Sequence, residues 1–187
     1  MKTLEAFAES FKTTLDSQDK RIEILRKNAF EEFSKAGIPT RKQEYWKFSD
    51  PSVILNLNLK YNDSSSDFDD NYDLILGNGK IIKNIVKGKS GSISEGIKKG
   101  YIDEKVLEIK ENPFLNLNSA FAVNGSYICL EKNSENNIRI LNLIDNKGIE
   151  QAVYPKIVIV AGENSNSTIF EEFRVVGKGT NFVNSVT

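Results

Sequence analysis

The sequence contains few side chains of the kinds that perform acid–base, nucleophilic or metal chemistry. Its 187 residues include no histidine and a single cysteine. Histidine is the usual general base near neutral pH and a common metal ligand, and one thiolate does not build a zinc or iron–sulfur site alone. We therefore expect no catalytic, cofactor-binding or metal-ligating residue in this chain.

The cysteine and one pair of carboxylates are the first candidates for chemistry. Cys129 lies in an apolar run over residues 127–130 without a neighbouring cation, which favours a packed and unreactive thiol. Glu171 and Glu172 are adjacent in a segment that reads as a strand. Because adjacent side chains of a strand point to opposite faces, we do not expect these two carboxylates to act together as acid and base.

Two glycine-containing motifs invite comparison with ligand-binding loops. Residues 88–90 (Gly-Lys-Ser) resemble the end of a phosphate-binding loop, but that motif requires a glycine where this sequence has Lys83. We interpret residues 88–90 as a solvated turn. Residues 77–79 (Gly-Asn-Gly) tolerate positive φ and lie between two β-prone runs, so they predict a hairpin.

A dense cluster of aromatic and charged side chains occupies residues 44–48 (Glu-Tyr-Trp-Lys-Phe). Large aromatic side chains are usually buried, so one interpretation is an arm whose Trp46 and Phe48 dock on the body of the protein. The other interpretation is a partner-binding segment, because aromatic residues are common interface anchors. The sequence leaves both interpretations open.

The elements that position these side chains follow from the hydrophobic pattern. Helical spacing predicts two amphipathic helices over residues 4–15 and 22–36, separated by capping residues 16–19. Gly37, closely followed by a proline, predicts that the second helix ends near Ala36. The stretch from residue 62 to 73 holds five aspartates and predicts a solvated loop.

The second half of the chain predicts mainly strands. Residues 94–111 indicate only short helical turns, and the apolar spacing after Pro113 predicts a short helix. Five β-prone runs follow, divided by polar and glycine clusters: residues 127–130, 138–144, 155–161, 168–176 and 182–186. Their spacing is compatible with a sandwich, a barrel or a solenoid, and no strict repeat chooses among these.

Charge and hydropathy indicate which classes of protein are excluded. The 25 basic and 26 acidic side chains give a net charge of −1, which offers no electrostatic footprint for nucleic acid. No apolar block of a signal peptide follows the first residues, and the apolar run at residues 157–161 is too short to cross a bilayer. We therefore expect a globular cytoplasmic protein without nucleic-acid or membrane partners.

Taken in chain order, several of these clusters resemble the SufB/SufD family, whose members are subunits of the SufBCD iron–sulfur cluster assembly complex. Arg26, Ala29 and Phe30, with residues 37–42 and 44–49, are similar to the amino-terminal signature of its SufD branch. Residues 112–121 are similar to the Asn-Pro-Phe, Leu-Asn and Ala-Phe block of the family. The likeness covers essentially the whole chain.

Two positions refine this resemblance. Phe121 favours SufD over SufB, where a valine and a tryptophan would follow Leu-Asn-Ser-Ala. Lys156 stands where the family resemblance would place an arginine after Pro155, and lysine does not reproduce the two-pronged hydrogen bonding of arginine. A bidentate contact at this position is therefore in doubt.

The resemblance implies an α+β fold in three parts. These are an N-terminal helical region with an aromatic arm at 1–50, an acidic loop with a small mixed α/β region and β-hairpin at 51–112, and the first coils of a right-handed parallel β-helix at 113–187. Family members continue through further β-helix coils and a helical tail, so the chain is expected to be an amino-terminal fragment.

The implied function is that of a non-catalytic scaffold subunit that supports cluster formation and transfer with SufB and SufC. The full complex handles the iron–sulfur cluster, and no cluster-building residue of the family can be carried over to a position here. The alternative is a β-solenoid enzyme or a recognition module whose site lies beyond residue 187.

Overall fold

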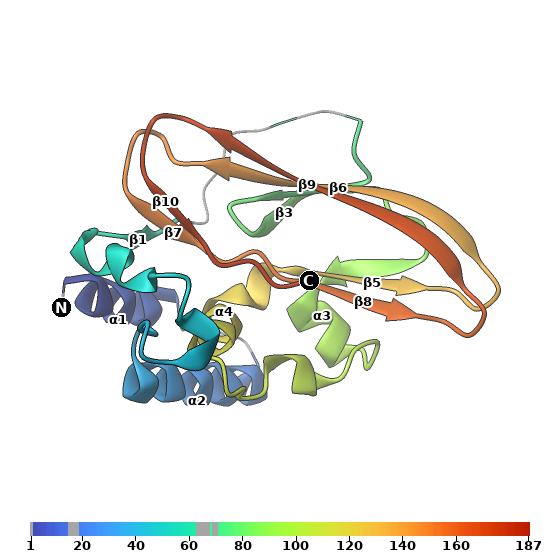
Figure 1. The fold of residues 1–187 in the computed structure, drawn as a ribbon. Coiled ribbons are helices and arrows are strands. Elements are labelled where there is room, and N and C mark those ends of the chain that lie inside the picture. Colours follow the sequence, from blue (N-terminus) through green and yellow to red (C-terminus); the bar gives the residue numbers. More distant parts are fainter. Residues whose placement is uncertain (1, 15–18, 63–67, 69–70) are drawn as a thin grey trace.

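A computed structural model describes residues 2–14, 19–62, 68 and 71–187. The helices form a layer that carries the amino terminus, and the strands stack beside it (Figure 1). The α-helices in the described residues are α1 (Lys2–Thr14), α2 (Lys20–Ala36), α3 (Ile93–Lys98) and α4 (Pro113–Phe121). Short 3₁₀ helices are η1 (Glu44–Trp46), η2 (Pro51–Asn56), η3 (Glu104–Leu107) and η4 (Ala122–Asn124).

Local signals set the bounds of the second helix, α2, as the sequence predicts. Asp19 caps α2 by accepting a hydrogen bond from the backbone N–H of Arg21, and Gly37 ends it with a positive φ of 69°. The buried face of α2 repeats every three or four residues: Ile22, Arg26, Ala29 and Phe33. Residues 16–18 of the predicted capping segment lie outside the described residues.

The helical layer encloses a core rich in aromatic rings. The rings of Phe11 and Phe30 stack at 4.3 Å between α1 and α2, and those of Phe121 and Tyr154 stack at 4.4 Å. Tyr154 follows directly after a strand, so this second stack joins the helices to the sheets. Such contacts add directional attraction to the burial of apolar surface.

The strands of the described part of the chain form three sheets. Their bounds are β1 (Lys60–Tyr61), β2 (Leu74–Gly77), β3 (Lys80–Asn84), β4 (Lys89–Ser92), β5 (Ser126–Leu130), β6 (Glu135–Asp145), β7 (Gln151–Val153), β8 (Ile157–Ala161), β9 (Asn166–Val176) and β10 (Asn181–Val183). The strand orders are β1-β7-β10, β3-β2-β6-β9 and β4-β5-β8. The long strands β6 and β9 run parallel to each other along their whole length (Figure 1).

The predicted hairpin is confirmed. Strands β2 and β3 pair antiparallel, and Asn78 and Gly79 both have positive φ, at 48° and 85°. These values fit a two-residue turn with both central residues left-handed. The predicted short helix after Pro113 and the five later strands are also present, with bounds shifted by a few residues. The pattern missed the short strands β1, β4 and β7.

The expected fold class needs a correction. The chain is α+β, but the right-handed parallel β-helix expected over residues 113–187 is not shown, and no closed barrel or solenoid is found in the described part of the chain. The strands instead form three separate sheets. Two of these are mixed, because β3 pairs antiparallel with β2 in one sheet and β4 pairs antiparallel with β5 in another. Strands from residues 60–92 supply neighbours in all three sheets.

The acidic loop falls partly on undescribed positions. Residues 63–67, 69 and 70, which carry most of its aspartates, lie outside the described residues. Asp73 is described, and its carboxylate accepts a hydrogen bond from the backbone N–H of Arg139 at 2.8 Å. This end of the loop is therefore held on β6.

Candidate partner-binding surface

The aromatic arm, residues 40–50, contains the 3₁₀ turn η1 and ends where a second 3₁₀ turn, η2, begins. Asp50 begins the second turn, η2, by accepting hydrogen bonds from the backbone N–H and the hydroxyl of Ser52 at 3.1 and 2.5 Å. Pro51 follows at the first helical position, where its fixed φ is favourable. The carboxylate of Asp50 also lies 3.5 Å from Nε of Arg41. Asp50 thus joins both halves of the arm.

The aromatic side chains of the arm divide into two kinds. Trp46 is half-buried, and its ring packs edge-on against that of Phe114 at 5.2 Å. Tyr45 and Phe48 are 99% and 92% exposed. The docking interpretation is therefore confirmed for Trp46 and wrong for Phe48. Because two large aromatic side chains three positions apart in the chain are left in solvent, the geometry favours the partner-binding interpretation.

Trp46 forms part of two neighbouring grooves. The larger has a volume of about 610 Å³, with Gln43, Tyr45 and Trp46 on one side and residues 110–115 on the other. The second, of about 420 Å³, continues past Trp46 towards Phe182 and Ser185. The volumes are those of small-molecule or side-chain pockets. The lining is mostly apolar, which suits the docking of a partner's side chains.

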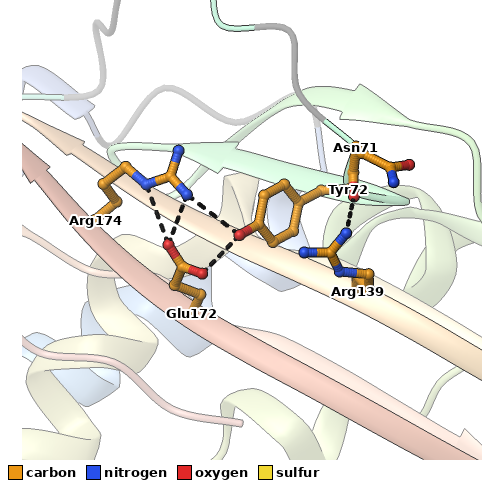
Figure 2. A network of polar contacts seen from close by, with 5 residues as sticks. All are labelled: Asn71, Tyr72, Arg139, Glu172 and Arg174. Atoms are coloured by element: carbon orange, nitrogen blue, oxygen red, sulfur yellow. Dashed lines mark hydrogen bonds and ion pairs between the residues drawn. The ribbon is translucent and has the colours of Figure 1, made fainter.

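A second candidate is a polar network on the outer side of the largest sheet (Figure 2). The hydroxyl of Tyr72 donates a hydrogen bond to Glu172 at 2.6 Å, and Arg174 donates to the same carboxylate at 2.7 and 3.1 Å. The guanidinium of Arg139 lies 4.6 Å from the centre of the Tyr72 ring and donates to the backbone carbonyl of Asn71 at 2.8 Å.

The electrostatics of this network make it a clamp and not a catalytic site. The hydrogen bonds from Tyr72 and Arg174 lower the pKa of Glu172, and the hydrogen bond to Glu172 raises the pKa of Tyr72. The carboxylate therefore stays ionised and the phenol stays protonated at neutral pH, so neither exchanges protons readily. The network instead fastens the segment around Tyr72 to β9.

Two of the remaining sequence candidates fit their structural interpretations, and the third fits only at its first residue. Glu171 faces away from Glu172 and accepts hydrogen bonds from Asn142 and Thr187, so the two carboxylates have different partners. Cys129 is half-buried, and burial raises the pKa of its thiol. Gly88 has a φ of 88° in the turn between β3 and β4, as a tight turn requires, but the predicted turn over residues 88–90 is wrong beyond Gly88, because Lys89 and Ser90 begin β4 and pair with Cys129 and Ile128 of β5.

The described residues contain no group of three or more histidine, cysteine, aspartate or glutamate side chains placed to hold a metal ion. No helix in the described part is both long enough and apolar enough to span a membrane.

Two buried cations were not recognised from the sequence as buried. Arg26 is 1% exposed and Lys156 is 5% exposed. Helical spacing places Arg26 on the apolar face of its helix, so the burial of Arg26 could have been predicted from the sequence. Lys156 follows a strand, β7, whose three residues are all buried, and this signal is weaker. Burial of both cations depends on contacts with α4, which is distant in sequence from Arg26.

Comparison with known proteins gives a match to a family model. Residues 2–76 match the family model described as the SufBD protein N-terminal region. The matched segment contains α1, α2, the aromatic arm and most of β2. This match supports a relationship to the SufB/SufD family and does not distinguish SufD from SufB. A search among curated proteins finds no match.

Proposed function

We propose that this chain is a non-catalytic, cytoplasmic scaffold subunit of the SufD type in an iron–sulfur cluster assembly complex. Its partners in this proposal are proteins of the SufB and SufC types. The observation that carries the proposal is the match of residues 2–76 to the SufBD protein N-terminal region, within which the aromatic arm leaves Tyr45 and Phe48 in solvent. The aromatic arm is the proposed contact with a partner.

The chemistry of the aromatic arm supports a protein partner. Exposed aromatic side chains have few rotatable bonds, so they lose little entropy when a partner covers them. The Lys47 ammonium lies 5.5 Å from the Phe48 ring, and Arg41 and Lys42 are exposed on the same segment. Cations around an apolar centre are typical of an interface with a polar rim. An acidic rim on the partner would complement these charges.

The packing beneath the aromatic arm supports a scaffold role. Trp46 rests on Phe114 of α4, and α4 packs along α2 through the hydrogen bond from Arg26 to Ala120. A partner bound at the aromatic arm would therefore contact a segment supported by the helical core. Pre-organised surfaces bind with a smaller entropic cost than mobile ones.

We propose that the iron–sulfur cluster is the cargo of the whole complex and is not ligated by this segment. Cys129 is its single cysteine, and no histidine is present. After anaerobic incubation with iron and sulfide, the isolated chain should acquire no cluster absorption in the visible range. A Cys129→Ser variant serves as the matched control. Absorption that depends on Cys129 would contradict this part of the proposal.

Co-purification tests the partners. The chain, co-expressed with SufB and SufC proteins from the same source, should be retained with them on an affinity column. The double variant Tyr45→Ser/Phe48→Ser should lower the affinity by about tenfold or more, because each removes an aromatic anchor. Ile85→Ser is the matched control, since Ile85 is 62% exposed in the loop between β3 and β4, outside the aromatic arm.

The outcomes separate the two parts of the proposal. Retention that the double variant loses and the Ile85→Ser variant keeps would support both parts. Retention that is equal in all three proteins would contradict the role of the aromatic arm. If the unaltered protein binds neither partner, the assignment to an assembly complex fails.

A further inference from the structure

The aromatic arm is closed at its base by one carboxylate. Oδ1 of Asp50 accepts the hydrogen bonds from the backbone N–H and the hydroxyl of Ser52, at 3.1 and 2.5 Å. Oδ2 of the same carboxylate lies 3.5 Å from Nε of Arg41. The two oxygens therefore hold different segments. One oxygen begins η2, and the other meets a residue near the start of the arm.

Both segments that this carboxylate connects are anchored in the helical core. Ile38, three residues before Arg41, is buried. On the other side, Ile54 of η2 is also buried, and its backbone carbonyl accepts a hydrogen bond from the hydroxyl of Thr3 in α1 at 2.6 Å. The ion pair therefore closes a loop whose two ends are already fixed.

Between these anchors, short-range turns hold the backbone of the arm. The N–H groups of Gln43, Trp46 and Ser49 each donate to the carbonyl three residues earlier, at 2.9–3.0 Å. The ring contact of Trp46 with Phe114 at 5.2 Å joins the middle of the arm to α4. Ordering each residue of a segment has an entropic cost that such local turns offset only in part. The contact that closes the base therefore influences how often the arm adopts this shape.

The Asp50 carboxylate carries its charge at neutral pH. The hydrogen bonds from Ser52, with a smaller contribution from the charge of Arg41, hold the pKa of Asp50 below its ordinary value of 3.8. The Asp50 side chain is 34% exposed and the Arg41 side chain is 66% exposed. An ion pair with this exposure has a modest strength and is screened by salt. Its effect is significant here because it acts on a segment held mainly by local turns.

We propose that Asp50 is a positioning residue of the partner-binding surface. Its pairing with Arg41 keeps the arm closed and presents Tyr45 and Phe48 in a fixed arrangement. A partner that binds the closed arm avoids the entropic cost of ordering it. The inference rests on the proposed function and adds that the apparent affinity depends on the closed fraction of the arm. Asp50 acts through the arm and not by touching the partner.

Two variants remove the ion pair from opposite sides. Asp50→Asn keeps an oxygen that caps η2 but loses the charge, and Arg41→Met loses the guanidinium. In hydrogen–deuterium exchange of the full chain, each variant should speed exchange of the amides of residues 42–49 by about two- to fivefold, as expected for a partly exposed ion pair. The double variant should exchange no faster than either single variant, because both remove the same interaction.

Matched controls separate the ion pair from a general effect of charge. Glu44→Gln and Lys42→Met repeat the two changes of charge at exposed positions of the same segment, and neither should alter exchange. Raising the salt concentration from about 50 to about 500 mM should speed exchange in the unaltered protein and not in Asp50→Asn. Trp46 is the single tryptophan, so its fluorescence emission should shift to the red where the arm opens. The unfolding midpoint of each variant checks that it is folded.

Binding kinetics separate positioning from direct contact. With SufB and SufC proteins from the same source, Asp50→Asn should lower the association rate by up to about fivefold. The dissociation rate should stay unchanged, because the contacts in the bound state remain. A change confined to the dissociation rate would indicate that Asp50 contacts the partner directly, and would overturn the proposal.

The other outcomes are equally decisive. Exchange that neither variant alters, or effects that add in the double variant, would show that the ion pair does not hold the arm closed. Faster exchange with an unchanged association rate would show that the partner does not depend on the closed arm. If the unaltered protein binds neither partner, the proposed function fails and this inference fails with it. Intact binding that is insensitive to Asp50→Asn rejects this inference alone.

Discussion

Arg26 of α2 donates a hydrogen bond from Nε to the backbone carbonyl of Ala120 in α4 at 2.6 Å. The residues are 94 positions apart, and the guanidinium is buried in the helical layer, 5.7 Å from the centre of the Phe11 ring of α1. One side chain therefore links three helices. Its aliphatic part fills space in the core, and its guanidinium donates a hydrogen bond to a buried backbone carbonyl.

Replacing Arg26 with alanine should destabilise the protein by about 2–4 kcal/mol, because it leaves a cavity and an unsatisfied carbonyl. Arg26→Met should cost less, since methionine fills much of the same space and removes a buried charge. Arg21→Ala is the matched control, because the Arg21 side chain is 64% exposed. Urea unfolding measures all three. Equal stabilities for the alanine and methionine variants would show that packing is not the main contribution.

Lys156→Met should stabilise the protein at pH 7, by up to about 3 kcal/mol. The folded pKa of about 8 is below the ordinary value of 10.5, so the folded state disfavours the charged amine at neutral pH. An apolar side chain of similar length removes this cost. Chemical unfolding at pH 7 measures the difference, with Lys99→Met as the exposed control.

The same group predicts a pH dependence with a definite sign. Between pH 8 and 10.5 the unfolded chain binds more protons at Lys156 than the folded chain, so this residue makes the protein more stable as the pH rises. The advantage of Lys156→Met should therefore shrink over this range. Buried Tyr154, whose pKa burial raises, acts in the opposite direction but is common to both proteins. An advantage that stays constant with pH would contradict the assignment to Lys156.

Trp46→Ala should lower stability by about 1–3 kcal/mol, because it removes the ring contact with Phe114 and part of the support beneath the aromatic arm. Tyr45→Ser and Phe48→Ser should each change stability by less than about 0.5 kcal/mol, since both side chains are in solvent. Thermal unfolding followed by circular dichroism separates the two classes. A large loss of stability in Phe48→Ser would mean that Phe48 is docked in solution.

The Tyr72 clamp should contribute to stability in an acid-dependent way. Hydrogen bonds from Tyr72 and Arg174 lower the folded pKa of Glu172 below its ordinary value of 4.5. Its contribution is therefore present above pH 4.5 and lost as the pH falls through the lowered value. Tyr72→Phe should lower the melting temperature at pH 7 and reduce the further loss on acidification. Tyr61→Phe, which alters no group in this network, is a suitable comparison.

Elements with strong local signals were predictable. The capping carboxylate of Asp19, the left-handed Gly37 and the residues 77–79 determine backbone geometry through their immediate neighbours, and the structure has all three as expected. β7 was missed because three buried residues show no periodicity. The expected β-helix over residues 113–187 is not shown, because strands from residues 60–92 supply neighbours in all three sheets and hydrophobic spacing does not specify such long-range pairing.

The candidate sites likewise combine features that the local sequence predicts with features that depend on distant segments. The composition of residues 44–48 predicted either a docked arm or a partner-binding segment. Only the tertiary structure shows that Trp46 is docked and that Phe48 is exposed. Nothing local to Lys156 indicates that its amine meets Ser119, 37 residues earlier in the chain. Burial of a polar group depends on which distant elements cover it, and its local sequence reports this weakly.

The sequence by itself determined where helices begin and end, where the hairpin turns, and that the chain has no histidine and one thiol for chemistry. These properties depend on backbone preferences and composition, which act over a few residues. Only the tertiary structure decided which strands become neighbours, which aromatic side chains stay in solvent, and that two cations are enclosed. Those outcomes depend on packing between segments far apart in the chain, where the burial of apolar surface outweighs the preference of any single residue.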